Sequence, residues 1–293
     1  MKIIEMYKSK KPVISFEISP PRSDMPLESI FDTLKQLTDM KPDYISVTYG
    51  AGGSQKGRTI DIAAKIKNDY GIESMCHFTC VGHSKSDIDS MLDLLAEKKL
   101  ENILALRGDP PVNDPGFDFS KNVYKHANEL IGHINNSKGS NFCIAAAAYL
   151  EGHPESSRIK DDILNLKEKV ETGVDFLVTQ LFFDNRLYYD FLDRTAALGI
   201  NCPITPGIMP IYKADQIKAI TAKSGCSIPA KLVLMMDKYA DNPDDLRKAG
   251  IEYAASQICD LLDNGAHGIH LYIMNRPKSS REILIAAGLV KDN

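Results

Sequence analysis

The chain has 293 residues, of which 43% are hydrophobic and 25% charged, and its formal net charge is −4. This is the composition of a folded globular protein, and an acidic balance argues against partners such as nucleic acid or an anionic membrane surface. No apolar run is long enough to span a bilayer, residues 1–5 are too charged for a secretion signal, and the six cysteines lack a disulfide-type spacing, so we expect a cytoplasmic protein with free thiols.

Short apolar segments and helical apolar stripes alternate along the chain. The segments that predict strands end at Gly, Pro or polar residues, and the stripes repeat every three or four residues. The expected strands are residues 13–19, 44–49, 74–81, 104–107, 142–149, 176–183, 204–208 and 268–274. The expected helices lie around residues 30–41, 62–70, 88–95, 123–134, 163–173, 188–199, 213–222, 228–265 and 282–287.

Strands and helices in this alternation predict a single (β/α)8 TIM barrel that forms one domain over residues 1–293. Each unit takes about 36 residues, and no shift in composition marks a domain boundary. A doubly wound parallel sheet is the alternative. It would be expected to carry a dinucleotide fingerprint after an early strand, whereas glycines 50, 52 and 53 form a lone glycine-rich turn without the downstream acid. We therefore expect the barrel.

Polar side chains stand at the C-terminal ends of most of the expected strands. In a barrel enzyme these ends form the mouth where ligands bind. Burying so many polar groups there is costly unless they bind something, so the pattern predicts a ligand site. For Arg107 and Asp109 the alternative is an ion pair that holds a surface turn. The strand-end set comprises Glu17, Thr48, Tyr49, His77, Thr79, Arg107, Asp109, Tyr149, Glu151, Gln180, Asn275 and Arg276.

Several classes of reaction are disfavoured at this mouth, because the residues that they require are missing from the strand ends. No lysine stands at a strand end, which argues against a Schiff base or pyridoxal phosphate, and no nucleophile elbow or Walker loop is present. Cys76, His77, Cys80 and His83 have a metal-like spacing. On a strand, however, both cysteines face away from His77, so we predict no metal site. An organic cofactor beside a substrate is therefore expected.

Glu17 is the candidate general acid. If Phe16 and Ile18 face the helices, the Glu17 side chain points into the barrel. A carboxyl group in partly apolar surroundings tends to hold its proton and can then donate it near neutral pH. The alternative is a structural ion pair with Arg22 or Arg107.

Several short motifs occur together in one order and spacing. They resemble those of the bacterial 5,10-methylenetetrahydrofolate reductases, from about residue 12 to the end of the chain. Any one of them would be a weak signal, whereas the ordered set is a strong one. The matching stretches are Phe16 and Glu17 with Pro20 and Pro21, then residues 47–51, 77–80, 106–109, 153–155, 179–184 and 206–210, and finally Asn275 and Arg276.

The resemblance implies an FAD-containing barrel that reduces 5,10-methylenetetrahydrofolate to 5-methyltetrahydrofolate, a step of one-carbon metabolism and methionine biosynthesis. It implies a ping-pong cycle in which a donor reduces the flavin and leaves before folate occupies the same face. NADH is the implied donor, a partner redox protein is the alternative, and the protein is expected to be a homo-oligomer. Glu17 would assist opening of the folate ring, and Asp109 would tune the flavin and contact the pterin.

The resemblance also assigns binding residues. Arg107 and Lys169 would meet the flavin pyrophosphate, and the helix with Asp162 and Asn165 would follow the ribose and adenine. Without the resemblance, this helix face would be interpreted as solvated. The implied cofactor-binding residues are Thr48, Tyr49, Ala51, His77, Arg107, Gly108, Asp109, Tyr149, His153, Asp162, Asn165 and Lys169. The implied substrate-binding residues are Asp109, Gln180, Gln216, Ile220 and Arg276.

Where the chain departs from the family pattern, the departures bear on the electron donor more than on the folate half-reaction. Relatives carry bulky aromatic residues where this chain has Ile18 and Ser19. Ile220 stands where some relatives use an aromatic residue to stack on the nicotinamide and on folate, whereas Gln216 is retained. The resemblance therefore implies the folate half-reaction more directly than the use of NADH.

Two other functions compete with the reductase. A barrel lyase or aldolase acting on a phosphorylated substrate is disfavoured by the missing strand-end lysine and metal ligands. A non-catalytic flavin- or folate-binding barrel within a larger redox complex is disfavoured by the joint presence of Glu17, Asp109 and Gln180.

Overall fold

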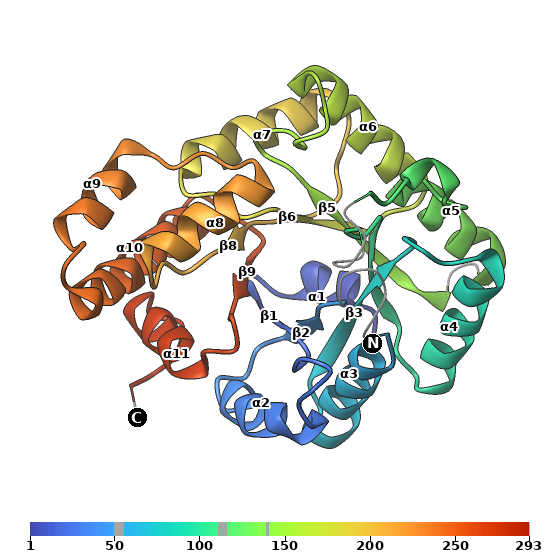
Figure 1. The fold of residues 1–293 in the computed structure, drawn as a ribbon, viewed down its shortest axis with the longest axis horizontal. Helices are drawn as coiled ribbons and strands as arrows, with labels where there is room; N and C mark the ends of the chain where they lie inside the picture. The colour runs from blue at the N-terminus through green and yellow to red at the C-terminus, as the bar shows by residue number, and fades with distance from the viewer. Residues whose placement is uncertain (50–55, 111–115, 139–140, 293) are drawn as a thin grey trace.

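The protein is a parallel β-barrel surrounded by helices (Figure 1). The computed structural model describes residues 1–49, 56–110, 116–138 and 141–292. Neighbouring strands follow the order β7-β6-β5-β4-β3-β2-β1-β9-β8, and every pair is parallel. The strands are β1 (Val13–Ile18), β2 (Tyr44–Val47), β3 (Glu73–Thr79), β4 (Asn102–Leu106), β5 (Cys143–Ala148), β6 (Phe176–Thr179), β7 (Ile204–Thr205), β8 (Gly207–Ile208) and β9 (Gly268–Tyr272).

The barrel closes at Pro206, which separates β7 from β8. β7 pairs with β6, and β8 pairs with β9. Pro206 has no N–H group to donate, but its carbonyl accepts a hydrogen bond from the backbone N–H of His270 at 2.9 Å. β7 and β8 therefore act as one seventh strand, which gives eight barrel positions and confirms the predicted (β/α)8 barrel over the doubly wound sheet.

Helices cover the outside of the barrel (Figure 1), and the main core lies between them and the strands. Phe16 and Ile18 are buried in this core, as predicted from the alternation along β1. The helices are α1 (Ile3–Ser9), η1 (Leu27–Ile30), α2 (Phe31–Thr38), α3 (Lys56–Tyr70), α4 (Lys85–Glu97), η3 (Phe119–Lys121), α5 (Ala127–Lys138), α6 (Ile159–Glu171), α7 (Asn185–Ala197), α8 (Ala214–Ser224), α9 (Ala230–Lys238), α10 (Pro243–Asp263) and α11 (Pro277–Ala286). None of the helices in the described ranges combines the length and apolar character needed to cross a membrane.

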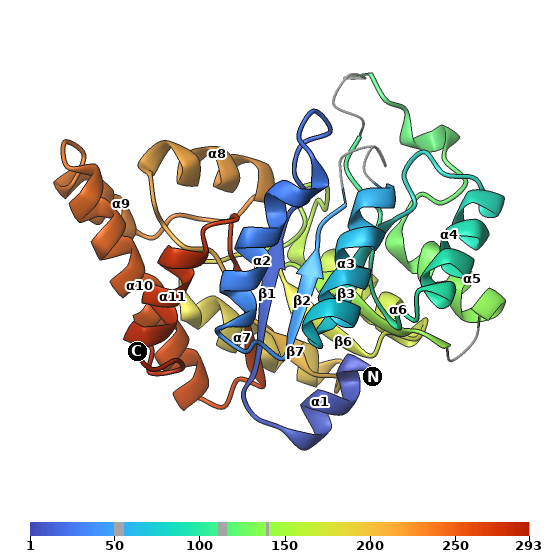
Figure 2. The same cartoon turned by 90° about the horizontal axis from the view of Figure 1, so that it is seen from below.

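A short N-terminal helix, α1, packs against the end of the barrel at which the strands begin (Figure 2). Ile3 and Tyr7 are buried with inward-facing strand residues such as Val13. The Tyr7 hydroxyl lies 2.6 Å from the Thr205 hydroxyl and 3.2 Å from that of Tyr44. This helix, which the local sequence pattern did not predict, closes one end of the barrel and leaves the other for ligands.

Some predicted boundaries were wrong by a few residues. β3 ends at Thr79 and β6 at Thr179, because the following residues leave the sheet at the mouth. Leu181 and Phe183, predicted to continue a strand, instead pack in a separate apolar cluster near α8 and α9.

Candidate functional site

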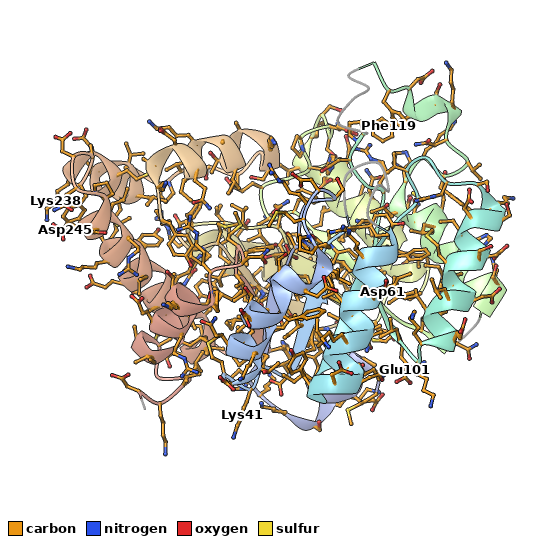
Figure 3. The ribbon with its side chains drawn as sticks, turned by 60° about the horizontal axis from the view of Figure 1, so that its bottom comes forward. Lys41, Asp61, Glu101, Phe119, Lys238 and Asp245 are labelled. Carbon is orange, nitrogen blue, oxygen red and sulfur yellow. The ribbon has the colours of Figure 1, made fainter. Side chains whose placement is uncertain are left out.

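A cavity of about 780 Å³ opens at the C-terminal ends of the strands. Figure 3 labels Phe119, beyond the end of β4, and Lys41, before the start of β2, at opposite ends of the barrel, with the cavity at the Phe119 end. A volume of this size is in the range of small-molecule and cofactor sites. The predicted site residues that line it are Glu17, Thr48, Tyr49, His77, Arg107, Gly108, Asp109, Tyr149, His153, Asp162, Asn165, Lys169 and Gln180.

Three predicted site residues in the described part of the chain are not brought to this lining, and for a fourth the lining is not described. Ala51 lies outside the described residues. Gln216 and Ile220 belong to α8, where Ile220 packs against an apolar cluster that contains Ile217. Arg276 is exposed at the start of α11, with its guanidinium carbon 5.0 Å from the centre of the Tyr212 ring. For these residues contact with a ligand stays a prediction.

Glu17 projects into the cavity from β1, as predicted. One carboxylate oxygen lies 3.2 Å from Nε2 of His77 and 3.3 Å from Nε2 of His270. The alternative ion pairs with arginine were wrong, because Arg22 pairs with Asp24 and Arg107 faces another carboxylate.

The two histidines decide the charge of Glu17. Burial raises the pKa of this carboxyl group, but the charges and hydrogen bonds of His77 and His270 outweigh burial and lower the pKa to about 2. The expectation of a proton held on Glu17 considered burial alone. In the structure the carboxylate is therefore the favoured form of Glu17.

His270 is a site residue that was not predicted from the sequence. It lies in β9 with a fully buried side chain, and its Nδ1 is 2.8 Å from the Ser15 hydroxyl. The alternation of residues along β9 could have indicated it, because His270 and the cavity-lining Tyr272 point to the same face. The same alternation correctly predicted that His77 lines the cavity while Cys76 packs in the outer core.

Arg107 faces Glu155 rather than Asp109. The two guanidinium nitrogens donate to the two carboxylate oxygens at 2.6 and 2.7 Å, so the pair is bidentate. These hydrogen bonds lower the pKa of Glu155. The guanidinium carbon also lies 4.3 Å from the centre of the Phe119 ring, a cation–π distance. The predicted alternative of an Arg107–Asp109 pair was therefore wrong, and Asp109 is exposed at the cavity rim.

The helix α6 lines the other side of the cavity with polar residues. Lys169 donates a hydrogen bond from Nζ to the carbonyl of Ala147 at 3.1 Å, and burial lowers its pKa. Asp162 accepts a hydrogen bond from the Ser156 hydroxyl at 2.9 Å. Asn165 lines the cavity with them and is exposed, so contact of this helix face with a ligand rather than with solvent stays a prediction.

Small residues leave room for a flat ligand between these walls. Gly108 has a φ of +95°, and a Cβ atom there would approach Val81 to 2.6 Å, so a larger residue is excluded. Ala147 and Ala148 of β5 also line the cavity. A cavity whose lining combines small residues with two cations, Arg107 and Lys169, fits a dinucleotide cofactor such as FAD.

Comparison with known proteins shows which family the chain resembles. The model of the methylenetetrahydrofolate reductase family matches residues 2–288. The 5,10-methylenetetrahydrofolate reductase of Escherichia coli K12 is 32% identical over 276 residues, covering 94% of this chain and 90% of the relative. The methylenetetrahydrofolate reductase (NADH) 1 of Arabidopsis thaliana is 33% identical over 306 residues, but the chain spans about half of its length, 52%.

A solved structure supports the fold. The chain is similar to an uncharacterised protein from Clostridium thermocellum that binds two copies of 5-methyl-5,6,7,8-tetrahydrofolic acid, with a TM-score of 0.66, 14% identity and 97% coverage of both chains. At this identity the likeness concerns the barrel alone. The family match over nearly the whole sequence and the identity to the bacterial relative carry the assignment: the chain belongs to the methylenetetrahydrofolate reductase family.

Proposed function

We propose that this protein reduces 5,10-methylenetetrahydrofolate to 5-methyltetrahydrofolate with bound FAD. The observation that carries the proposal is that Glu17 and His77 line the same cavity as Arg107 and Lys169, two cations suited to a pyrophosphate, while the buried His270 contacts Glu17 from behind. Membership of the family and the names of the relatives support the substrate. The whole chain would act as one catalytic domain, in the cytoplasm and as a homo-oligomer.

FAD would occupy the cavity with its pyrophosphate at Arg107 and Lys169. Asp162 and Asn165 would hold the ribose and adenine side. When bound, FAD supplies a hydride to the folate after it has been reduced by a donor. The residues proposed to surround the rest of the cofactor are Thr48, Tyr49, Ala51, His77, Gly108, Asp109, Tyr149 and His153.

Glu17 is proposed as the catalytic acid, held in place by its contacts with His77 and His270. In the folate, the bond between the methylene carbon and one ring nitrogen breaks, and that nitrogen takes the proton from Glu17. The methylene carbon becomes an electrophilic cation and receives the hydride, which completes the methyl group. Because the pKa of Glu17 is lowered in the ligand-free protein, Glu17 must take up a proton before it can act as the acid.

The remaining proposed residues bind and orient the folate. The carboxylate of Asp109 would stabilise the positive charge that develops during ring opening. Gln180 lines the cavity and would contact both donor and folate. Gln216 and Ile220 would lie along the folate, and Arg276 would bind its acidic tail. The donor is NADH or a partner redox protein.

An anaerobic stopped-flow experiment on Glu17→Gln tests the acid. Reduction of the flavin by its donor needs no proton from Glu17, so its rate should stay within about twofold, whereas the folate half-reaction should slow by about 10²- to 10⁴-fold. Glu151→Gln is a matched control, because Glu151 accepts hydrogen bonds from the Ser227 backbone and is absent from the cavity lining.

The wild-type spectra decide the rest of the proposal. Bleaching of a flavin band by both NADH and 5-methyltetrahydrofolate would support the reaction and the donor together. Bleaching by the folate alone would direct the search for electrons to a partner protein. Equal loss of both half-reactions in Glu17→Gln would refute the acid role, and a protein that neither contains nor binds flavin would refute the function.

A further inference from the structure

The chain turns sharply between β9 and α11, directly before Arg276. Met274 and Asn275 both have left-handed backbones, with φ of +53° and +52°. Asn tolerates this conformation, but a long side chain such as that of Met rarely adopts it. Two consecutive left-handed residues persist only where surrounding contacts fix them, and such strain is commonly found at functional sites.

The side chain of Asn275 supplies one of these contacts. Its Nδ2 donates to the Ser19 carbonyl at 3.0 Å, and its Oδ1 accepts from the Ser19 backbone N–H at 3.3 Å. The amide therefore pairs with both backbone groups of one residue, as a neighbouring strand would. The Ser19 hydroxyl in turn accepts from the hydroxyl of the cavity-lining Thr48 at 3.0 Å.

This pairing joins two loops that carry different functional groups. Ser19 follows Glu17 by two residues, and the Glu17 carbonyl accepts the last bond between β1 and β9, from the Ile273 N–H at 3.1 Å. On the other side, Arg276 follows Asn275 and lies over the Tyr212 ring.

We propose that Asn275 is a positioning residue that ties the loop after β1 to the loop after β9 and so fixes Arg276 relative to Glu17. The inference rests on the function proposed above, in which Glu17 acts at the folate ring and Arg276 binds the folate tail. With a fixed distance between Glu17 and Arg276, one folate molecule could contact both residues at once. Asn275 would then favour folate binding by preorganising the site and not by contacting the folate.

The test uses Asn275→Gly in the flavin-loaded protein. Glycine adopts the left-handed backbone conformation but has no side-chain amide, so the variant removes the hydrogen bonds to Ser19 without adding strain. KM for 5,10-methylenetetrahydrofolate should rise about 5- to 10-fold, while kcat and the affinity for FAD stay within about twofold. Asn275→Asp can accept a hydrogen bond from Ser19 but cannot donate one to it, so its KM should lie between those of the wild type and Asn275→Gly. Met274→Asn keeps the amide and relieves the left-handed strain, so its KM should match that of the wild type.

A double variant shows whether Asn275 acts through Arg276. If it does, Asn275→Gly should add little to the KM of Arg276→Ala, because the residue that it positions is already lost. Multiplying effects of the two substitutions, or an unchanged KM in Asn275→Gly, would overturn the proposal. A fall in kcat at unchanged KM would also overturn it.

Hydrogen exchange tests the pairing without any folate chemistry. Pro20 and Pro21 carry no amide hydrogen, so Ser19 is the last exchanging position of its segment. Its exchange should accelerate in Asn275→Gly and stay unchanged in Met274→Asn; unchanged exchange in both would refute the pairing. A protein with this exchange pattern but no folate turnover would contradict the proposed function and leave the pairing established.

Discussion

The carboxylate of Glu17 links the stability of the protein to pH. Its pKa in the folded protein is about 2, below the ordinary value of 4.5. Between these values the unfolded chain binds a proton that the folded chain does not, so protonation favours unfolding. The stabilisation contributed by Glu17 is therefore complete above about pH 4.5 and is lost as the pH falls towards 2.

Glu17→Gln should remove this dependence. We expect the free energy of unfolding at pH 6 to fall by on the order of 1–3 kcal/mol, and the difference from wild type to shrink as the pH falls below 4.5. Urea titrations at stepped pH values measure both. Glu252→Gln is the control, because Glu252 is exposed on α10. Wild-type and Glu17→Gln curves that stay parallel down to pH 2 would contradict the assignment.

Single residues also show how far the sequence alone can predict a site. The inward direction of Glu17 follows from the alternation of one strand, so it was predictable. Its partner His270 is 253 residues away and meets it only because β9 pairs with β1 in one register. Arg107 and Glu155 are separated by 48 residues in the same way. Pairings of this kind depend on tertiary register, which local patterns do not contain.

At the scale of elements, the junction of β7 and β8 leaves no room for a side chain at Gly207. A Cβ atom on Gly207 would lie 2.5 Å from the Thr179 carbonyl oxygen and 2.8 Å from the Tyr272 hydroxyl. Gly207→Ala should therefore destabilise the protein by about 1–3 kcal/mol, because backbone must move to admit the methyl group. Thermal and urea unfolding measure the loss.

Gly57→Ala is the matched control for this substitution. Gly57 lies in α3, and a Cβ atom there would meet no atom within 4 Å. The change should leave stability unaltered or raise it by up to about 1 kcal/mol, since alanine favours helix more than glycine does. Equal effects at the two glycines would show that the junction is not tightly packed.

The elements themselves were mostly predictable, with two instructive exceptions. Each barrel strand is an apolar segment bounded by polar or turn residues, and the predicted seventh strand, residues 204–208, is present. Its break at Pro206 follows from barrel closure and not from the local pattern. The helix α1 was missed because only Ile3 and Tyr7 of its seven residues are buried, too few to give a helical stripe.

At the scale of the whole molecule, the two ends of the barrel should have separate roles. Tyr7 and Lys169 lie at opposite ends, the first in α1 and the second in the lining of the cavity. Tyr7→Phe removes hydroxyl contacts with Thr205 and Tyr44 and should cost about 1–3 kcal/mol of stability with unchanged FAD affinity. Lys169→Met should weaken FAD binding by about 10- to 100-fold with little effect on the stability of the cofactor-free protein.

The two changes should be independent, because distant sites without shared partners give additive effects. Isothermal calorimetry and urea unfolding of the double variant test this. Lys167→Met on the same helix is the control, since Lys167 pairs with Glu171 at 3.7 Å and is absent from the cavity lining. A large loss of FAD affinity in Tyr7→Phe would contradict this independence, because it would show that the end of the barrel covered by α1 affects cofactor binding at the other end.

The Arg107–Glu155 pair gives the mouth a counter-ion of its own. An anionic ligand that binds Arg107 would displace a carboxylate of the protein instead of salt ions from solution. Glu155, whose side chain is 59% exposed, can take up water when it is released. Arg107 exchanges one anionic partner, Glu155, for another, the ligand, so the number of charges exposed to salt ions changes little on binding. Affinity for such a ligand should therefore depend less on ionic strength than two cavity cations would suggest, and the guanidinium is held in place before the ligand arrives.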